Sequence, residues 1–249
     1  MPPPVVLQAE ALKKTYPGSA APALDQCDLT VWEGELFGLL GPNGAGKTTV
    51  ISLVSTLFKP DSGRMSICGI DARTSPDKVR HMIGLVPQDI ALYADLTARE
   101  NLRYFGRLFG IRRGELTLRI RRCLEWVGLE DRAEQRIATF SGGMKRRINL
   151  AIGLLHDPRF LLLDEPTVGI DAQSRNLILE RLATLPPKGT TILYTTHYME
   201  EAERLCTRVG IIDAGHMVAQ GTPHALLRER GVASLGELFL NLTGKHLRD

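Results

Sequence analysis

The chain has 249 residues, of which 43% are hydrophobic and 24% are charged, and its formal net charge at pH 7 is +3. This length and apolar content allow one large α/β unit or two small lobes with a real core. The net charge is small, and the sequence shows no basic face interleaved with stacking aromatic side chains, so the composition argues against a nucleic-acid-binding protein.

The first predicted elements are strands. Residues 5–12 and 24–31 are apolar segments of strand length, and a third segment at 64–68 follows the turn Pro60-Asp61-Ser62-Gly63. We expect these three strands to form an antiparallel subdomain beside the main core.

A glycine-rich loop follows the next predicted strand, residues 36–40. The loop matches the phosphate-binding pattern G-x-x-x-x-G-K-[ST] at every fixed position; its residues are Gly41, Pro42, Asn43, Gly44, Ala45, Gly46, Lys47 and Thr48. Lys47 begins a predicted helix, whose apolar face at i, i+3, i+4, i+7 and i+8 is formed by Val50, Leu53, Val54, Leu57 and Phe58. A loop between a strand and a helix is the context that this pattern requires.

The chemistry of this loop follows from its residue types. Glycines let the backbone wrap closely around phosphates with its N–H groups inward, and the helix N-terminus adds partial positive charge. We expect Lys47 to reach the β- and γ-phosphates, Thr48 to ligate Mg²⁺ and Thr49 to bond a phosphate oxygen. The loop therefore predicts a nucleotide site.

A helical pattern extends from about residue 97 to 155, interrupted by Gly110, Gly114 and Gly128. Its last helix begins at Ser141-Gly142-Gly143, and the start of this helix is a second anion site by the same dipole argument. One chain cannot easily bring two separated helix starts to one γ-phosphate. We therefore expect a head-to-tail dimer, in which the second site of each copy closes the first site of the other.

The apolar run 160–163 predicts a strand buried on both faces of a parallel sheet, and it ends in Asp164 and Glu165. Acids at the C-terminal end of such a strand lie where open α/β sheets bind ligands. We expect Asp164 to hold Mg²⁺ and Glu165 to act as general base on the attacking water. Further strands are predicted at 190–194 and in a hairpin of 208–213 with 217–220, and a helical tail from about 222.

The order of these motifs resembles that of the nucleotide-binding subunits of ABC transporters, over nearly the whole chain. Residues 41–48 match the Walker A loop, Ser141 to Gly143 the signature motif and residues 161–165 the Walker B strand. The remaining family positions are the Q-loop glutamine, the D-loop, the switch histidine that contacts the γ-phosphate and the aromatic that stacks on adenine; they match Gln88, Asp171 (in 168–171), His197 and Tyr16.

The resemblance implies an α/β P-loop NTPase (ABC ATPase) fold with a RecA-like core, an antiparallel β subdomain and a helical subdomain. One nucleotide-binding domain would cover residues 1–249, with the core and β subdomain at 5–96 and 157–221, the helical signature subdomain at 97–156 and a short helical tail at 222–249. The implied cofactors are ATP and Mg²⁺. The implied catalytic residues are Lys47, Gln88, Glu165 and His197, and the implied metal ligands are Thr48, Gln88 and Asp164.

The implied activity is ATP hydrolysis that drives separate transmembrane permease subunits through closure of an ATP-bound dimer of nucleotide-binding subunits. Docking is expected around residues 89–96, where Leu92 and Tyr93 could line a groove or pack inward. Phe140 and Met144 replace the usual leucine and glutamine of the signature, so the N–H groups of Gly142 and Gly143 are expected to carry the phosphate contact. Met144 with the basic residues 145–147, and the ending 237–244, resemble ABC-2-type exporters of drugs, antibiotics or lipid- and polysaccharide-like molecules.

Two other classes stay open at this point. One is an ABC-type ATPase that is not attached to a transporter; the other is a phosphate-loop switch or kinase, which would need neither the signature helix start nor His197. The sequence also leaves open the transported molecule and whether the dimer pairs two identical chains.

The expected location is cytoplasmic, at the membrane face and held there by permease subunits. No stretch approaches the roughly 18 consecutive apolar residues of a membrane span, and the beginning, Met1 to Pro4, lacks the charge and apolar core of a signal peptide. The four cysteines, at positions 27, 68, 123 and 206, form no C-x-x-C pair. Disulfides and zinc are therefore not expected, which suits a reducing compartment.

Overall fold

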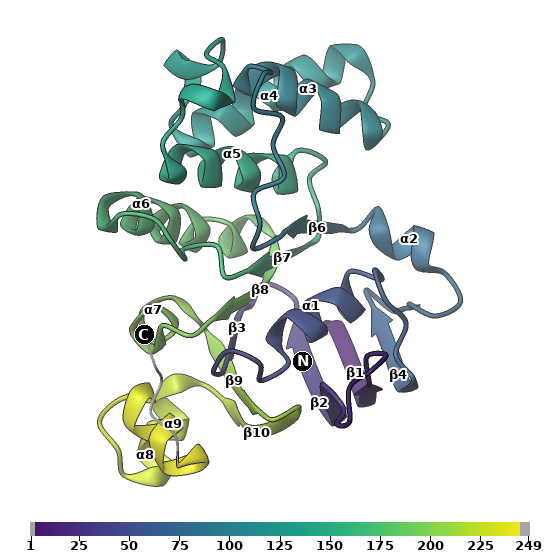
Figure 1. Ribbon diagram of the computed structural model, residues 1–249, viewed down its shortest axis with the longest axis vertical. Coiled ribbons are helices and arrows are strands. Elements are labelled where there is room, and N and C mark those ends of the chain that lie inside the picture. The colour runs from purple at the N-terminus through teal and green to yellow at the C-terminus, as the bar shows by residue number, and fades with distance from the viewer. Residues whose placement is uncertain (1–2, 245–249) are drawn as a thin grey trace.

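A six-stranded sheet forms the centre of the molecule in the computed structural model, which describes residues 3–244 (Figure 1). Its strand order is β10-β9-β3-β8-β7-β6. All neighbouring strands are parallel except the hairpin of β9 and β10. The strands are β3 (Leu36–Leu40), β6 (Ile83–Val86), β7 (Phe160–Asp164), β8 (Thr191–Thr196), β9 (Arg208–Asp213) and β10 (His216–Gly221). The apolar runs at β3 and β7 are buried at every position, as the sequence predicted.

A second, antiparallel sheet has the order β2-β1-β4-β5. It consists of β1 (Val5–Lys14), β2 (Leu24–Trp32), β4 (Ser62–Ile67) and the short β5 (Ile70–Asp71). Helix α2 (Pro76–Arg80) then leads to β6. The predicted antiparallel subdomain is confirmed, because the three segments expected to form it are its three long strands.

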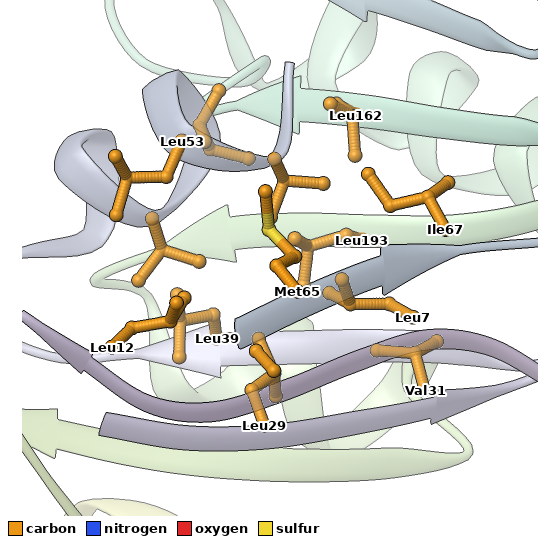
Figure 2. Close-up of a cluster of buried hydrophobic side chains, with 14 of the residues drawn as sticks. Leu7, Leu12, Leu29, Val31, Leu39, Leu53, Met65, Ile67, Leu162 and Leu193 are labelled. Atoms are coloured by element: carbon orange, nitrogen blue, oxygen red, sulfur yellow. The ribbon is translucent and has the colours of Figure 1, made fainter. Parts of the chain in front are cut away.

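The alternation of side chains along β3, β7 and β8 divides the interior into two layers. Phe37, Leu39, Leu162 and Leu193 pack with the antiparallel sheet and with α1 (Lys47–Val54). Figure 2 shows this cluster, in which Leu7 and Leu29 of the antiparallel sheet join Leu39 of β3 and Leu193 of β8. The residues next to them in sequence, such as Leu36 and Leu161, point to the opposite face, because successive side chains of a strand alternate.

Helices cover that opposite face and also form a separate helical layer. The cover consists of α6 (Ala172–Ala183), α7 (Met199–Leu205), α8 (Pro223–Arg230), α9 (Leu235–Thr243) and part of α5 (Gly142–Leu154). The helical layer combines α5 with α3 (Ala98–Leu108), α4 (Arg113–Val127) and the 3₁₀ turns Glu130–Arg132 and Ile137–Thr139 around its own apolar cluster. A third 3₁₀ turn, Pro186–Lys188, follows α6. Figure 1 shows the helical layer as a separate tier, far from the antiparallel sheet.

The structure corrects the predicted first helix. This helix ends at Val54, and Leu57 and Phe58 are 66% and 44% exposed, so they do not extend its apolar face. The reason is a turn at Thr56, whose φ of +59° leaves the helical region, after which the N–H groups of both residues bond to the carbonyl of Ser52.

Two smaller expectations also change. Gly114 lies inside the first turn of α4 and does not interrupt it, whereas Gly128 ends α4 in the left-handed conformation. The predicted helical tail is two helices, α8 and α9, and its last five residues, 245–249, lie outside the described part of the chain.

Candidate functional site

The phosphate-binding loop, residues 41–48, joins the C-terminal end of β3 to the start of α1. Gly46 has a φ of +110°, and a Cβ there would lie 2.7 Å from the carbonyl oxygen of Ala23. A Cβ on Gly41 would lie 2.4 Å from the carbonyl oxygen of Ile212. Backbone conformation at one position and close approach at both therefore require glycine.

Lys47 lies at the centre of the site and is buried. Its Nζ donates to the carbonyl oxygens of Gly41 (2.8 Å) and Pro42 (3.1 Å) and lies 3.0 Å from Oε1 of Glu165. The N–H groups at the start of α1 have no side-chain cap, and the first turn of this helix carries no acid. No acid of the helix itself therefore competes for its positive end, and the nearby carboxylates come from the end of β7.

The predicted acids are adjacent to a threonine that the sequence reading missed. Thr195 on β8 pairs with Asp164 on β7, and its hydroxyl donates to Oδ1 of Asp164 (2.7 Å) while accepting from the N–H of Glu165 (3.0 Å). Burial raises the pKa of Asp164 above its usual value, and the hydroxyls of Thr195 and Thr48 partly offset this by hydrogen bonding. Thr195 lies two residues before His197, but only strand pairing reveals its role.

Glu165 has a strained backbone at the end of β7. Its φ is +46°, in the left-handed region that residues with a Cβ rarely adopt. The carboxylate is 6% exposed. Oε2 lies 3.2 Å from Nδ1 of His197, and Oε1 faces Lys47. The side chains of Lys47, Glu165 and His197 are far apart in sequence. They nevertheless form one connected polar group at the C-terminal ends of the central strands.

Tyr16, the predicted adenine-stacking residue, lies beside the first turn of α1. Its hydroxyl donates to Oγ1 of Thr49 (3.4 Å), and its ring meets Phe58 edge-on at 5.9 Å between centroids. The predicted residues Tyr16, Thr48 and Thr49 thus surround the same helix start.

The signature segment is built differently. Ser141 caps α5 by accepting from the N–H of Met144 (3.2 Å), and Ser141 and Gly142 are exposed. Gly143 is buried against α6, where a Cβ would lie 2.1 Å from Oγ of Ser174. Asp171 caps α6 by accepting from the N–H of Ser174 (2.8 Å). Across residues 3–244, none of these polar groups bonds to the phosphate-binding loop of the same chain.

Gln88 is exposed on the loop after β6. The signature helix holds this loop, since Arg146 (2.9 Å) and Asn149 (3.4 Å) both donate to the carbonyl oxygen of Pro87. Both residues are buried, and the sequence predicted neither of these contacts. They connect the Gln88 loop to the helix that begins at Ser141.

The donor set at the first site suits Mg²⁺. The hydroxyl of Thr48 and the carboxylate of Asp164 already interact, and both are hard oxygen donors of the kind that Mg²⁺ takes together with phosphate oxygens.

Comparison with known proteins agrees with this geometry. The family described as "ABC transporter" matches residues 24–168. The linearmycin resistance ATP-binding protein of Bacillus subtilis (strain 168) is 49% identical over 238 residues, which is 96% of this chain and 75% of the relative. The Nod factor export ATP-binding protein I of Cupriavidus metallidurans is 45% identical over 222 residues, 89% of this chain and 73% of the relative.

A solved structure is similar as well. It is a dimeric ATP-binding cassette in a post-hydrolysis state, bound to ADP and Pi. Its TM-score is 0.78 at 28% identity, and the match covers 87% of this chain and 98% of that one. The P-loop fold with its core, β subdomain and helical subdomain is therefore confirmed.

Proposed function

This chain belongs to the ABC transporter ATP-binding family and is an ATPase of that family, and from this premise we propose that it drives export through separate membrane-spanning subunits. Two relatives support the direction of transport, because one is named for antibiotic resistance and the other for Nod factor export. The signature residues Met144 to Arg147 support the same subgroup. The transported class would be drugs, antibiotics or lipid- or polysaccharide-like molecules.

The hydrolysis step of this proposal rests on the connected set Lys47, Glu165 and His197 at the C-terminal ends of the central strands. In the proposed reaction, Lys47 binds the β- and γ-phosphates, Glu165 accepts a proton from the attacking water and His197 contacts the γ-phosphate. Tyr16 would stack on the adenine. A carboxylate within hydrogen-bond distance of a histidine is well placed to orient both water and phosphate.

Mg²⁺ would be held by Thr48 and Asp164, with Gln88 as the third protein contact. When bound, it neutralises phosphate charge during transfer. The buried position of Asp164 strengthens its attraction for a cation, because the local dielectric constant is low.

Each ATP would be enclosed by two chains. The phosphate-binding loop comes from one chain, and Ser141, Gly142, Gly143 and Asp171 come from its partner. The exposure of Ser141 and Gly142 supports this arrangement, since a helix start facing solvent is available to a second chain. The dimeric state of the similar structure supports it as well.

Permease subunits would dock on the surface of residues 89–96 and leave the protein peripheral on the cytoplasmic face of the membrane. Tyr93 is 49% exposed and meets Tyr104 of α3 edge-on at 4.9 Å, whereas Leu92 packs against the helical core. The proposed groove thus includes Tyr93 and excludes Leu92. Among residues 3–244, no helix has both the length and the apolar character to cross a membrane.

The test is to purify the tagged variant Glu165→Gln from detergent-solubilised membranes in the presence of ATP and to identify what co-purifies with it. We expect it to bind ATP, to lose turnover and to accumulate as a closed dimer together with a polypeptide of about six apolar spans. Glu180→Gln, an exposed change of the same kind on α6, is the matched control. Normal hydrolysis by Glu165→Gln would show that the base assignment is wrong. Recovery of soluble partners alone would favour the alternative, an ABC-type ATPase not attached to a transporter.

A further inference from the structure

A buried carboxylate lies behind the strand ends that carry the proposed base and the proposed switch histidine. Glu201, on α7, is 6% exposed. Its Oε2 accepts from the hydroxyls of Tyr194, Thr167 (2.9 Å) and Thr196 (3.5 Å). Arg175 of α6 lies 3.5 Å from Oε1. One side chain is thus bonded to β8 and to the turn that follows β7.

The turn after β7 contains the strained backbone of Glu165. A non-glycine residue with positive φ, such as Glu165, persists only where its surroundings restrain it on both sides. On one side, its N–H donates to Thr195 (3.0 Å). On the other side the chain is held two residues later, where Thr167 is fully buried and its hydroxyl donates to Glu201.

The end of β8 is held by the same carboxylate. Thr196 directly precedes His197; its hydroxyl lies 3.5 Å from Glu201 and accepts from the N–H of Tyr198 (2.9 Å). The guanidinium of Arg175, the cation beside Glu201, lies 4.6 Å from the centre of the Tyr198 ring. The backbone on both sides of His197 is therefore tied to Glu201 or to its partners.

We propose that Glu201 is a positioning residue for ATP hydrolysis, because its carboxylate ties the end of β7 to the end of β8 and so sets the separation of Glu165 and His197. The inference rests on the proposed function, which gives these two residues their roles. A neutral amide cannot serve as common acceptor for three hydroxyls while also facing Arg175, so the two strand ends would lose their shared restraint.

The decisive variant is Glu201→Gln, which keeps the shape of the side chain. We expect kcat to fall ten- to a hundredfold, the loss expected for a misplacement of about 1 Å. KM for ATP should stay within about twofold, because Glu201 makes no hydrogen bond or ion pair to residues 41–48 in the described chain. Glu200→Gln is the matched control, since it makes the same change on the exposed side of α7.

A second pair of variants covers the case in which Glu201→Gln does not fold. Thr167→Val removes the hydroxyl at constant shape and should lose kcat, whereas Thr167→Ser should retain it. Equal kcat for Glu201→Gln and Glu200→Gln, or equal behaviour of the two Thr167 variants, would overturn the inference. Inactivity of the unmodified chain would refute the proposed function instead, so the two failures are distinguishable.

Discussion

The two glycine-rich helix starts, at α1 and α5, use similar residues but are completed in different ways. The start of α1 is buried among groups of its own chain: Lys47 meets Glu165, and Thr48 meets Asp164. The start of α5 is capped by Ser141, and there Ser141 and Gly142 are exposed while Gly143 is buried against α6. The first site is completed by groups of its own chain, whereas in the proposed dimer the second would present its N–H groups to the partner chain. The proposed reaction therefore requires both helix starts in one composite site.

The largest effect is expected when two inactive variants, one at each helix start, are mixed. Lys47→Ala should lose at least a hundredfold in kcat, because it removes a charge preorganised for the transferring phosphoryl group. Gly142→Asp should be comparably inactive, since it puts an anion at the second anion site. It should still fold, because within residues 3–244 the nearest atom outside its own helix and its chain neighbours, the carbonyl oxygen of Gly169, lies 3.9 Å from the added Cβ.

Mixed dimers of these two variants contain one composite site with both changes and one intact site. Random pairing makes about half of the dimers mixed, so the mixture should recover roughly a quarter of normal ATPase activity per site. Steady-state ATPase assays of each variant and of the mixture decide the matter. A mixture as inactive as its components would place both glycine-rich starts at one site in the same chain.

Thr195 tests whether the site at the start of α1 is held together by residues of its own chain. Thr195→Val removes the donor to Asp164 and the acceptor for the N–H of Glu165, so kcat should fall about tenfold and the free energy of unfolding by about 1–3 kcal/mol. Thr195→Ser keeps the hydroxyl and serves as control. ATPase kinetics and denaturant unfolding measure the two effects, and equal values for both variants would remove Thr195 from the site.

The second site can be tested through its packing. Gly143→Ala brings a Cβ into contact with Ser174, which should cost about 1–3 kcal/mol of stability through overpacking. Adding Ser174→Gly removes the clashing atoms and should restore part of that loss, beyond the sum of the two single effects. Chemical denaturation of the unmodified chain, the two single variants and the double variant gives the four free energies of unfolding that this double-mutant cycle needs. Strict additivity would show that the two residues do not touch.

The smallest effect concerns the far end of the signature helix. His156, just beyond α5, hydrogen-bonds the carbonyl oxygen of Ile83 (2.8 Å), and burial lowers the pKa of its imidazole below the usual 6.5. The unfolded chain therefore binds a proton at a higher pH than the folded chain does. Stability should therefore fall as pH drops below about 6.5, because the unfolded chain takes up the proton first.

Thermal midpoints between pH 7.5 and 5 measure this dependence. His156→Gln removes the titrating group, so the slope of stability against pH should be shallower in this variant than in the unmodified chain. An unchanged slope would assign the acid sensitivity to other groups.

The family, the order of motifs and the strands buried on both faces could be read from the sequence alone, which also predicts the residues of both anion sites. These follow from local signals: a fixed glycine–lysine spacing, apolar runs and capping residues, each readable over a few positions. The first helix was predicted too long, because periodicity continued to Phe58 while the backbone turned at Thr56.

The contacts of the predicted site residues could be known only from the tertiary structure. Thr195 contacts Asp164 because β7 and β8 pair in parallel. Glu201 accepts hydrogen bonds from Thr167, in the turn after β7, and from Thr196, at the end of β8. Arg146, on α5, donates to the carbonyl oxygen of Pro87, 59 residues earlier in the chain and next to Gln88. Such contacts join residues that are distant in sequence. No local pattern encodes them, because strand register and helix packing form only when the whole core assembles.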